Sequence, residues 1–264
     1  MEIDLYGLGI GIRSNDPAVL EQLPHFLPLG WKSLTSGVVE RQYSVCSVPR
    51  ENGSKRYFVQ QGPHPLEESD DLPYALEALQ RDVELFVTEH AQGHVFVHAG
   101  VVGCHGRAIL IPGRSFSGKS SLVAALCHAG ATYYSDEYAV IDPEGLVAAY
   151  PRSLHLRREI PNVPLTKGDH QDQAIDRRPL PIALIVMTRY DAQAVWNPRP
   201  MEKGQALLEL MANTMSAQRQ PQKVFAVFER ALRRAQAIQS ARAEASAITA
   251  QLLNYVKSEN QANS

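Results

Sequence analysis

The feature that most constrains this chain is the segment GRSFSGKS at residues 113–120, which matches the pattern GxxxxGK[ST]. The apolar run RAILIP precedes it, and Leu122, Val123 and Leu126 then fall on one side of a helix that ends near Gly130. The sequence therefore predicts a strand, a glycine-rich turn and a helix in that order. This order is typical of an α/β domain in which the turn lies at an edge of the β-sheet.

Length and composition limit the classes of protein that need to be considered. With 264 residues, of which 44% are hydrophobic, the chain can form one large domain or two small ones around a buried core. A net charge of −2 predicts no bulk attraction to nucleic acid or to an anionic membrane. No basic segment precedes an apolar run at the amino terminus, and no stretch has the length of a membrane span. Cys46, Cys104 and Cys127 are scattered and predict neither disulfides nor a zinc site, so a soluble, cytoplasmic protein is expected.

Three regions are expected along the chain. Residues 1–94 are predicted to form an N-terminal accessory α+β region, and residues 95–216 an α/β domain that contains the GRSFSGKS motif. Residues 217–264 form a basic C-terminal region, and the pattern after about Glu202 is helical throughout.

Within the first region, the alternation of Leu8, Ile10 and Ile12 predicts a strand. The segment GPHPLEESDDLP is rich in turn-forming residues, and Asp71 or a neighbour can cap a helix that follows it. The apolar residues spaced three and four apart on the face of that helix are Leu76, Leu79, Val83, Phe86 and Val87.

Within the second region, residues 95–112 are predicted to form a hairpin whose second strand leads into the motif. The segment TYYSDEYAVID at residues 132–142 is predicted to be one strand. Residues 152–181 form a basic loop punctuated by proline, and the apolar run at residues 182–187 predicts a buried strand.

The GRSFSGKS motif itself predicts a cradle for phosphate groups. Its glycines allow consecutive backbone N–H groups to point inward at the positive end of the following helix. Lys119 can then reach the β- and γ-phosphates of a nucleotide, and the Ser120 hydroxyl can bind Mg²⁺. The alternative is a glycine-rich turn with an exposed lysine. The residues expected to bind ATP are Gly113, Arg114, Ser115, Phe116, Ser117, Gly118, Lys119, Ser120 and Ser121.

Two acidic residues, Asp136 and Glu137, follow the helix and occupy the edge of the sheet at which ligands gather. A carboxylate there can hold Mg²⁺ or can accept a proton from an attacking hydroxyl group, as a kinase base does. The alternative is a capping or surface pair in a turn.

Other polar residues are candidates for supporting roles. His98 lies among apolar residues, where it is either a core histidine or a group that orients the acid at position 136. Arg157, Arg158 and Arg189 are candidates for stabilising charge on a transferred phosphoryl group, or are solvated arginines.

The joint spacing of His98, the GRSFSGKS motif and Asp136 is similar to that of a known family. On these residues, the chain from 95 to about 215 resembles the catalytic domain of the HPr(Ser) kinase/phosphorylase family. The resemblance implies a phosphoenolpyruvate-carboxykinase-like fold, in which a mixed β-sheet core is combined with helices, and phosphorylation of serine hydroxyls. It also implies that Asp136 activates the acceptor hydroxyl, that Glu137 lies near the metal, and that His98 lies beside the catalytic acid.

The sequence also departs from that family. The loop LHLRREIPNVPLTKG lacks the glycine-containing signature associated with reverse phosphorolysis, and residues 1–94 do not resemble the usual N-terminal domain. The arrangement is closer to divergent HPr-kinase-related proteins, some of which phosphorylate a serine of a modified peptide such as a lasso peptide. Phosphoryl transfer is carried over from the resemblance, whereas the acceptor, the reverse reaction and a ring-like homo-oligomer stay open.

These observations lead to one main expectation and one alternative. The main expectation is an ATP- and Mg²⁺-dependent kinase whose acceptor is a hydroxyl group, foremost a serine of a peptide or protein, with a small molecule as a further acceptor class. Asp136, His98 and Lys119 are the expected catalytic residues, and Ser120 and Glu137 the expected metal ligands. The alternative is a nucleotide-binding regulatory or scaffold module without kinase activity.

Overall fold

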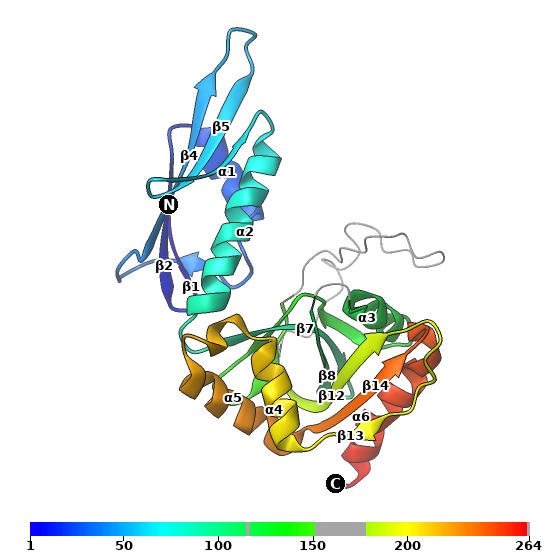
Figure 1. Cartoon of the computed structure of the whole chain (residues 1–264). Coiled ribbons are helices and arrows are strands. Elements are labelled where there is room, and N and C mark those ends of the chain that lie inside the picture. Colours follow the sequence, from blue (N-terminus) through cyan, green and yellow to red (C-terminus); the bar gives the residue numbers. More distant parts are fainter. Residues whose placement is uncertain (115–116, 151–177, 263–264) are drawn as a thin grey trace. The chain divides into compact units, whose positions relative to one another are not determined.

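A computed structural model describes residues 1–114, 117–150 and 178–262, with side chains up to Lys257. The chain divides into two compact units, Met1–Gly93 and His94–Ser264. Each unit is built on a β-sheet that mixes parallel and antiparallel neighbours, and helices accompany both sheets (Figure 1). The protein is therefore of the α/β class, as predicted.

The first unit contains a six-stranded sheet in the order β3-β1-β2-β4-β5-β6. Strands β2 and β4 run parallel, and the other neighbours run antiparallel. The predicted strand around Ile10 is confirmed as β2, whereas β6 covers residues expected to form turns, because its backbone pairs with β5. The strands are β1 (Glu2–Leu5), β2 (Leu8–Ser14), β3 (Lys32–Ser33), β4 (Arg41–Pro49), β5 (Lys55–Gln61) and β6 (His64–Ser69).

Helix α2 (Leu72–His90) confirms the helix predicted for this unit. It begins where the Asp71 carboxylate accepts a hydrogen bond of 2.9 Å from the Tyr74 amide, and its apolar face is buried. The Tyr43 hydroxyl of β4 donates a hydrogen bond of 2.6 Å to Asp82, which joins the sheet to this helix. The short elements α1 (Pro17–Gln22) and η1 (Leu23–His25) connect β2 to the later strands.

The second unit contains an eight-stranded sheet in which β8, β12 and β14 run parallel to one another (Figure 1). Strand β11 pairs with both β10 and β12, so the pairings β7-β8-β12-β11-β10 close into a ring. The predicted hairpin and buried strand are confirmed as β7-β8 and β12. The strands are β7 (Val95–Cys104), β8 (Arg107–Pro112), β9 (Thr132–Ser135), β10 (Tyr138–Ile141), β11 (Leu146–Ala148), β12 (Leu180–Tyr190), β13 (Arg199–Pro200) and β14 (Gln236–Arg242).

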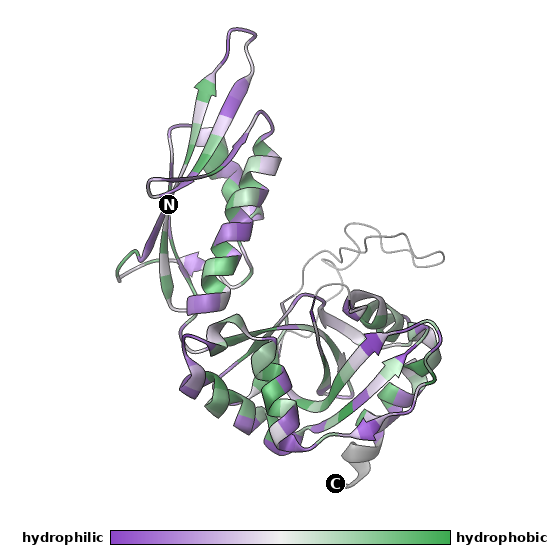
Figure 2. Ribbon diagram, viewed as in Figure 1, coloured by the Kyte–Doolittle hydropathy of each residue, from purple (hydrophilic) through white to green (hydrophobic). Residues whose placement is uncertain are grey.

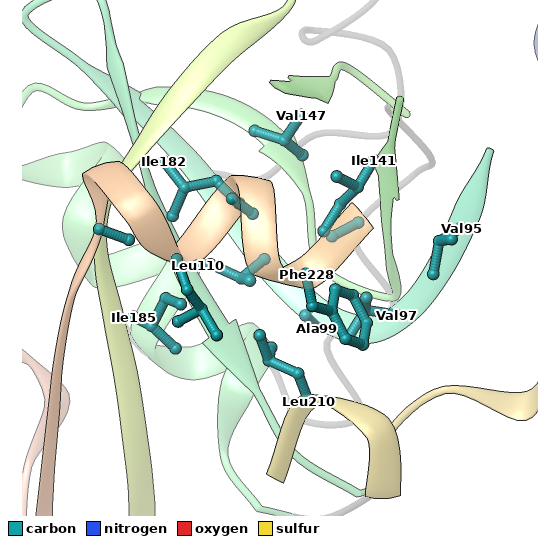
Figure 3. Packing of buried hydrophobic residues seen from close by; sticks show 14 of the residues in the cluster. Val95, Val97, Ala99, Leu110, Ile141, Val147, Ile182, Ile185, Leu210 and Phe228 are labelled. Carbon is teal, nitrogen blue, oxygen red and sulfur yellow. The ribbon is translucent and has the colours of Figure 1, made fainter. Parts of the chain in front are cut away.

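Helices cover both faces of this sheet because successive strand residues point to opposite sides. Leu110 packs with Phe228 and Leu210 of α5 and α4, as Figure 3 shows, and its neighbour Ile109 packs on the side of α3 and α6. Hydrophobic residues line the central strands, and α4 and α5 carry both hydrophobic and hydrophilic residues (Figure 2). The helical elements are α3 (Lys119–His128), α4 (Lys203–Ala212), η2 (Met215–Ala217), α5 (Pro221–Arg234), η3 (Ala245–Ile248) and α6 (Thr249–Ala262).

Two sequence-based predictions about this unit were wrong. The single strand expected at residues 132–142 is divided into β9 and β10, because the Ser135 hydroxyl accepts hydrogen bonds from the amides of Glu137 and Tyr138 and turns the chain. The C-terminal region is not helical throughout, since β14 pairs with β12 in the middle of the sheet. Most of the predicted loop at residues 152–181 lies outside the described residues. No helix in the described ranges is long and apolar enough to cross a membrane.

Candidate functional site

The GRSFSGKS motif connects β8 to α3, as predicted. Its first residue, Gly113, donates a backbone hydrogen bond of 3.1 Å to the His98 carbonyl oxygen. Gly118 has a left-handed backbone with φ of 85°, and its carbonyl oxygen accepts the first helical hydrogen bond of α3 from Leu122. The loop therefore opens directly onto the N-terminal end of a helix. Ser115 and Phe116, two of the predicted nucleotide ligands, lie outside the described residues.

Lys119 is buried, with 6% of its surface exposed, so it is not the exposed lysine of the alternative interpretation. Its ammonium group donates a hydrogen bond of 2.9 Å to the Arg114 carbonyl oxygen within the same loop. Burial lowers the pKa of Lys119 to about 8, and the charges of Asp136 and Glu137 oppose that shift. The lysine, the loop and the acid pair are therefore within electrostatic reach of one another.

The acid pair occupies the break between β9 and β10. Asp136 is 8% exposed, and the Tyr133 hydroxyl donates a hydrogen bond of 2.9 Å to its Oδ1 atom. The Ala99 amide donates a hydrogen bond of 3.0 Å to the Glu137 carbonyl oxygen, which fixes the break against β7. Asp136 is thus a buried, oriented carboxylate rather than a surface residue. Sequence reasoning missed Tyr133, since a tyrosine three residues before an acid forms no recognisable pattern.

His98 lies on β7 directly opposite Tyr138 of β10. Its ring centroid is 5.9 Å from that of Tyr138, and its backbone carbonyl is the acceptor for Gly113. Burial, followed by the charge of Lys119, lowers the pKa of His98 to about 4. The imidazole is therefore neutral near pH 7 and lies close enough to Lys119 to sense its charge.

Gly100 is a further residue that sequence reasoning missed. A Cβ atom at this position would lie 2.6 Å from Val123 Cγ2, far inside van der Waals contact, and 3.8 Å from Lys119 Cβ. The missing side chain lets α3 pack closely on β7, and this packing holds Lys119 against the strand beside the acid pair. A glycine within an apolar strand was the available signal for such a close approach.

Three buried polar atoms, one in the motif and two near the carboxyl ends of β12 and β14, lack a hydrogen-bond partner within the described part of the chain. Ser117 Oγ, Thr188 Oγ1 and Arg242 Nε are three of the seven buried side-chain atoms in the described ranges that have no hydrogen-bond partner. Arg242 ends β14, and Thr188 lies two residues before the end of β12, the parallel strand between β8 and β14. Buried polar atoms are nearly always hydrogen-bonded in proteins, so this group indicates a site for a polar ligand. Thr188 directly follows the predicted strand and was accessible to sequence reasoning, but Arg242 was not, because β14 was not predicted.

The residues expected to bind Mg²⁺ supply hard oxygen donors but not a complete coordination shell. Ser120 is half-buried in the first turn of α3, and Glu137 lies in the acid pair. No group of three or more His, Cys, Asp or Glu side chains that could hold a metal occurs in the part of the chain described. The donor set fits Mg²⁺, which usually takes one or two protein ligands together with phosphate oxygens and water.

The remaining sequence candidates contribute less. Arg189 is exposed at the end of β12, and Arg157 and Arg158 lie outside the described residues. A cavity of about 340 Å³ lies at the opposite end of β8 from the motif, next to the turn at His105 and Gly106. None of the predicted site residues lines this cavity. The candidate site is therefore defined by the motif, Lys119 and the acid pair rather than by the cavity.

No protein-family model and no curated protein matches this chain.

Proposed function

We propose that this protein is an ATP- and Mg²⁺-dependent kinase of the HPr-kinase-like type, which transfers the γ-phosphoryl group to a hydroxyl acceptor, foremost a serine of a peptide or protein. The observation that carries this proposal is the position of Lys119. Its buried ammonium group donates a hydrogen bond to the Arg114 carbonyl oxygen of the glycine-rich loop and interacts electrostatically with Asp136 and Glu137. This arrangement supports a site in which the glycine-rich loop binds phosphate close to a buried acid.

The binding step follows from the loop and the start of α3. In the proposed complex, backbone amides of residues 113–121 surround the triphosphate, as in P-loops generally. Lys119, whose burial opposes its positive charge, gains a counter-charge when the phosphates bind. Ser120 and Glu137 are the residues proposed to hold Mg²⁺, which neutralises charge on the β- and γ-phosphate oxygens when bound.

The transfer step assigns the proton to Asp136. The acceptor oxygen attacks the γ-phosphorus while the bond from that phosphorus to the β,γ-bridging oxygen breaks, and ADP leaves. The acceptor hydroxyl proton passes to the Asp136 carboxylate, which the Tyr133 hydroxyl holds in one orientation. Protonated Lys119, which interacts electrostatically with Asp136 and has neutral His98 as a neighbour, is proposed to balance charge on the transferring group from the side of the loop.

The change Asp136→Asn tests the assignment of the base. We expect transfer of labelled γ-phosphate to fall by about 100-fold or more, while the Kd for MgATP changes by less than about threefold, because the carboxamide keeps the shape but cannot accept the proton. Exposed Glu144 provides the control, since Glu144→Gln removes the same charge outside the site. Undiminished transfer by Asp136→Asn would overturn the role of this acid.

We seek the acceptor among the products of genes that neighbour the gene for this protein. Each product is incubated with the protein, ATP and Mg²⁺, and its intact mass is measured. The mass of one added phosphate, absent with Asp136→Asn, supports a kinase. Formation of a nucleotide-dependent complex without added phosphate would instead support a regulatory or scaffold module.

A further inference from the structure

Arg242 is the last residue of β14 and is 1% exposed. Its Nη2 atom donates a hydrogen bond of 2.7 Å to the Gly118 carbonyl oxygen, and its Nη1 atom donates one of 2.9 Å to the Ala243 carbonyl oxygen. The Gly118 oxygen also accepts the first helical bond of α3, from Leu122. Arg242 therefore forms a hydrogen bond with Gly118, the residue before Lys119, although the two are 124 positions apart in the sequence.

Gly118 is adapted to this contact. A Cβ atom added there would lie 2.6 Å from Arg242 Nη2, so any side chain would displace the guanidinium. The backbone φ of 85° disfavours other residues as well. The absence of a side chain at Gly118 thus allows both the left-handed backbone of the loop and the hydrogen bond from Arg242.

The charge of Arg242 has no close counterpart in the described residues. No carboxylate of these residues forms an ion pair with it, and Nε lacks a hydrogen-bond partner. Exposed Glu244 acts from a distance, and the Tyr190 ring centroid lies 5.9 Å from the guanidinium carbon. Burial accordingly lowers the pKa of Arg242 from its usual value. A buried cation without an acid is costly and is usually matched by some other negative charge.

We infer that Arg242 is a positioning residue for the nucleotide site, which fixes Gly118 at the start of α3 and whose uncompensated charge is balanced by bound polyphosphate. This inference rests on the proposed function. Lys119 contacts phosphate directly in that proposal. Arg242 instead acts through its hydrogen bond to the Gly118 carbonyl oxygen and through its positive charge close to the loop. Two independent observations, the bond to Gly118 and the unpartnered Nε, converge on the same place.

The test compares substitutions that separate charge from hydrogen bonding. Arg242→Lys keeps the charge, Arg242→Gln keeps a donor for Gly118 without charge, and Arg242→Met keeps only the bulk. Exposed Arg234→Gln is the control with the same loss of charge. For each full-length variant, the Kd for MgATP is measured by calorimetry, and the unfolding temperature is measured with and without MgATP.

We expect Arg242→Lys to bind MgATP within about threefold of wild type and both uncharged variants to bind at least tenfold more weakly. The nucleotide-induced rise in unfolding temperature should shrink for the uncharged variants, because their empty forms no longer contain an uncompensated cation. The Lys variant and either uncharged variant decide the matter if the other does not fold. Equal MgATP affinity among folded Lys, Gln and Met variants would overturn the inference. Absence of binding by wild type and by Arg234→Gln would instead overturn the proposed function.

Discussion

At the scale of single residues, the fold lowers the pKa of Lys119 in the GRSFSGKS motif. Its pKa of about 8 in the empty protein lies below its ordinary value of 10.5, so the folded chain binds fewer protons than the unfolded chain between these values. The contribution of Lys119 to stability is therefore least favourable below pH 8 and becomes more favourable as the pH rises from 8 to 10.5.

Nucleotide binding should depend on the same proton, because phosphate favours the charged ammonium. Above pH 8, we expect MgATP affinity to fall by up to about tenfold per pH unit, with uptake of as much as one proton per site. Calorimetry at pH 8.5 in buffers of different ionisation enthalpy measures this uptake. Lys119→Met is the matched variant and should show none. A wild-type heat of binding that is the same in every buffer would contradict the assignment.

The residues of the candidate site were accessible to sequence reasoning to different degrees. Lys119 and Asp136 stand at recognisable positions relative to a motif, so their neighbourhood was predicted and the structure brings them together. Tyr133 acts through a hydrogen bond to Asp136, and Arg242 acts through a contact with a distant segment from a strand that was not predicted. No local pattern records such contacts, because a single polar residue is compatible with many environments.

At the scale of elements, the packing of α3 on β7 depends on Gly100. We expect Gly100→Ala to lower the free energy of unfolding by about 1–3 kcal/mol, because the new methyl group overlaps Val123 Cγ2. Chemical denaturation measures the change. In the double variant Gly100→Ala/Val123→Ala, the overlap is removed, so its destabilisation should be smaller than the sum of the single effects.

Gly204 near the start of α4 is the matched control for this substitution. A Cβ atom there meets nothing within 4 Å, so Gly204→Ala should leave stability unchanged or raise it by up to about 1 kcal/mol. Similar losses at both glycines would show that the close approach of α3 to β7 is not the cause.

The elements predicted correctly are those with a strong internal pattern. Helix α2 has a capping aspartate and an apolar face, and β12 is a continuous apolar run. Strands β6 and β14 have weaker patterns and form because a neighbouring strand supplies backbone partners. The division between β9 and β10 depends on Ser135, whose hydroxyl competes with the ladder for backbone amides.

At the scale of the whole molecule, each compact unit has a hydrophobic core of its own. Ile10, Tyr43 and Leu76 are fully buried in the first unit, and Leu110, Ile185 and Phe228 in the second. A unit with its own core can fold independently if it buries enough apolar surface. The first unit, Met1–Gly93, is the smaller and has less core to stabilise it.

Separate expression of residues 1–93 and 94–264 tests this independence. We expect each fragment to unfold cooperatively on heating, as followed by circular dichroism, and the second to bind MgATP within about threefold of the full chain. The second fragment should also keep the Lys119-dependent proton uptake. A folded second fragment without nucleotide binding, beside a full chain that binds, would show that the first unit contributes to the site.

The two hydrogen bonds that β7 makes around the candidate site have an evolutionary consequence. His98 accepts from Gly113 through its carbonyl group, and the adjacent Ala99 donates to Glu137 through its amide. Neighbouring main-chain groups of one strand thus contact both the glycine loop and the acid pair. Because both contacts use backbone atoms, substitutions of the surrounding side chains can accumulate without removing them.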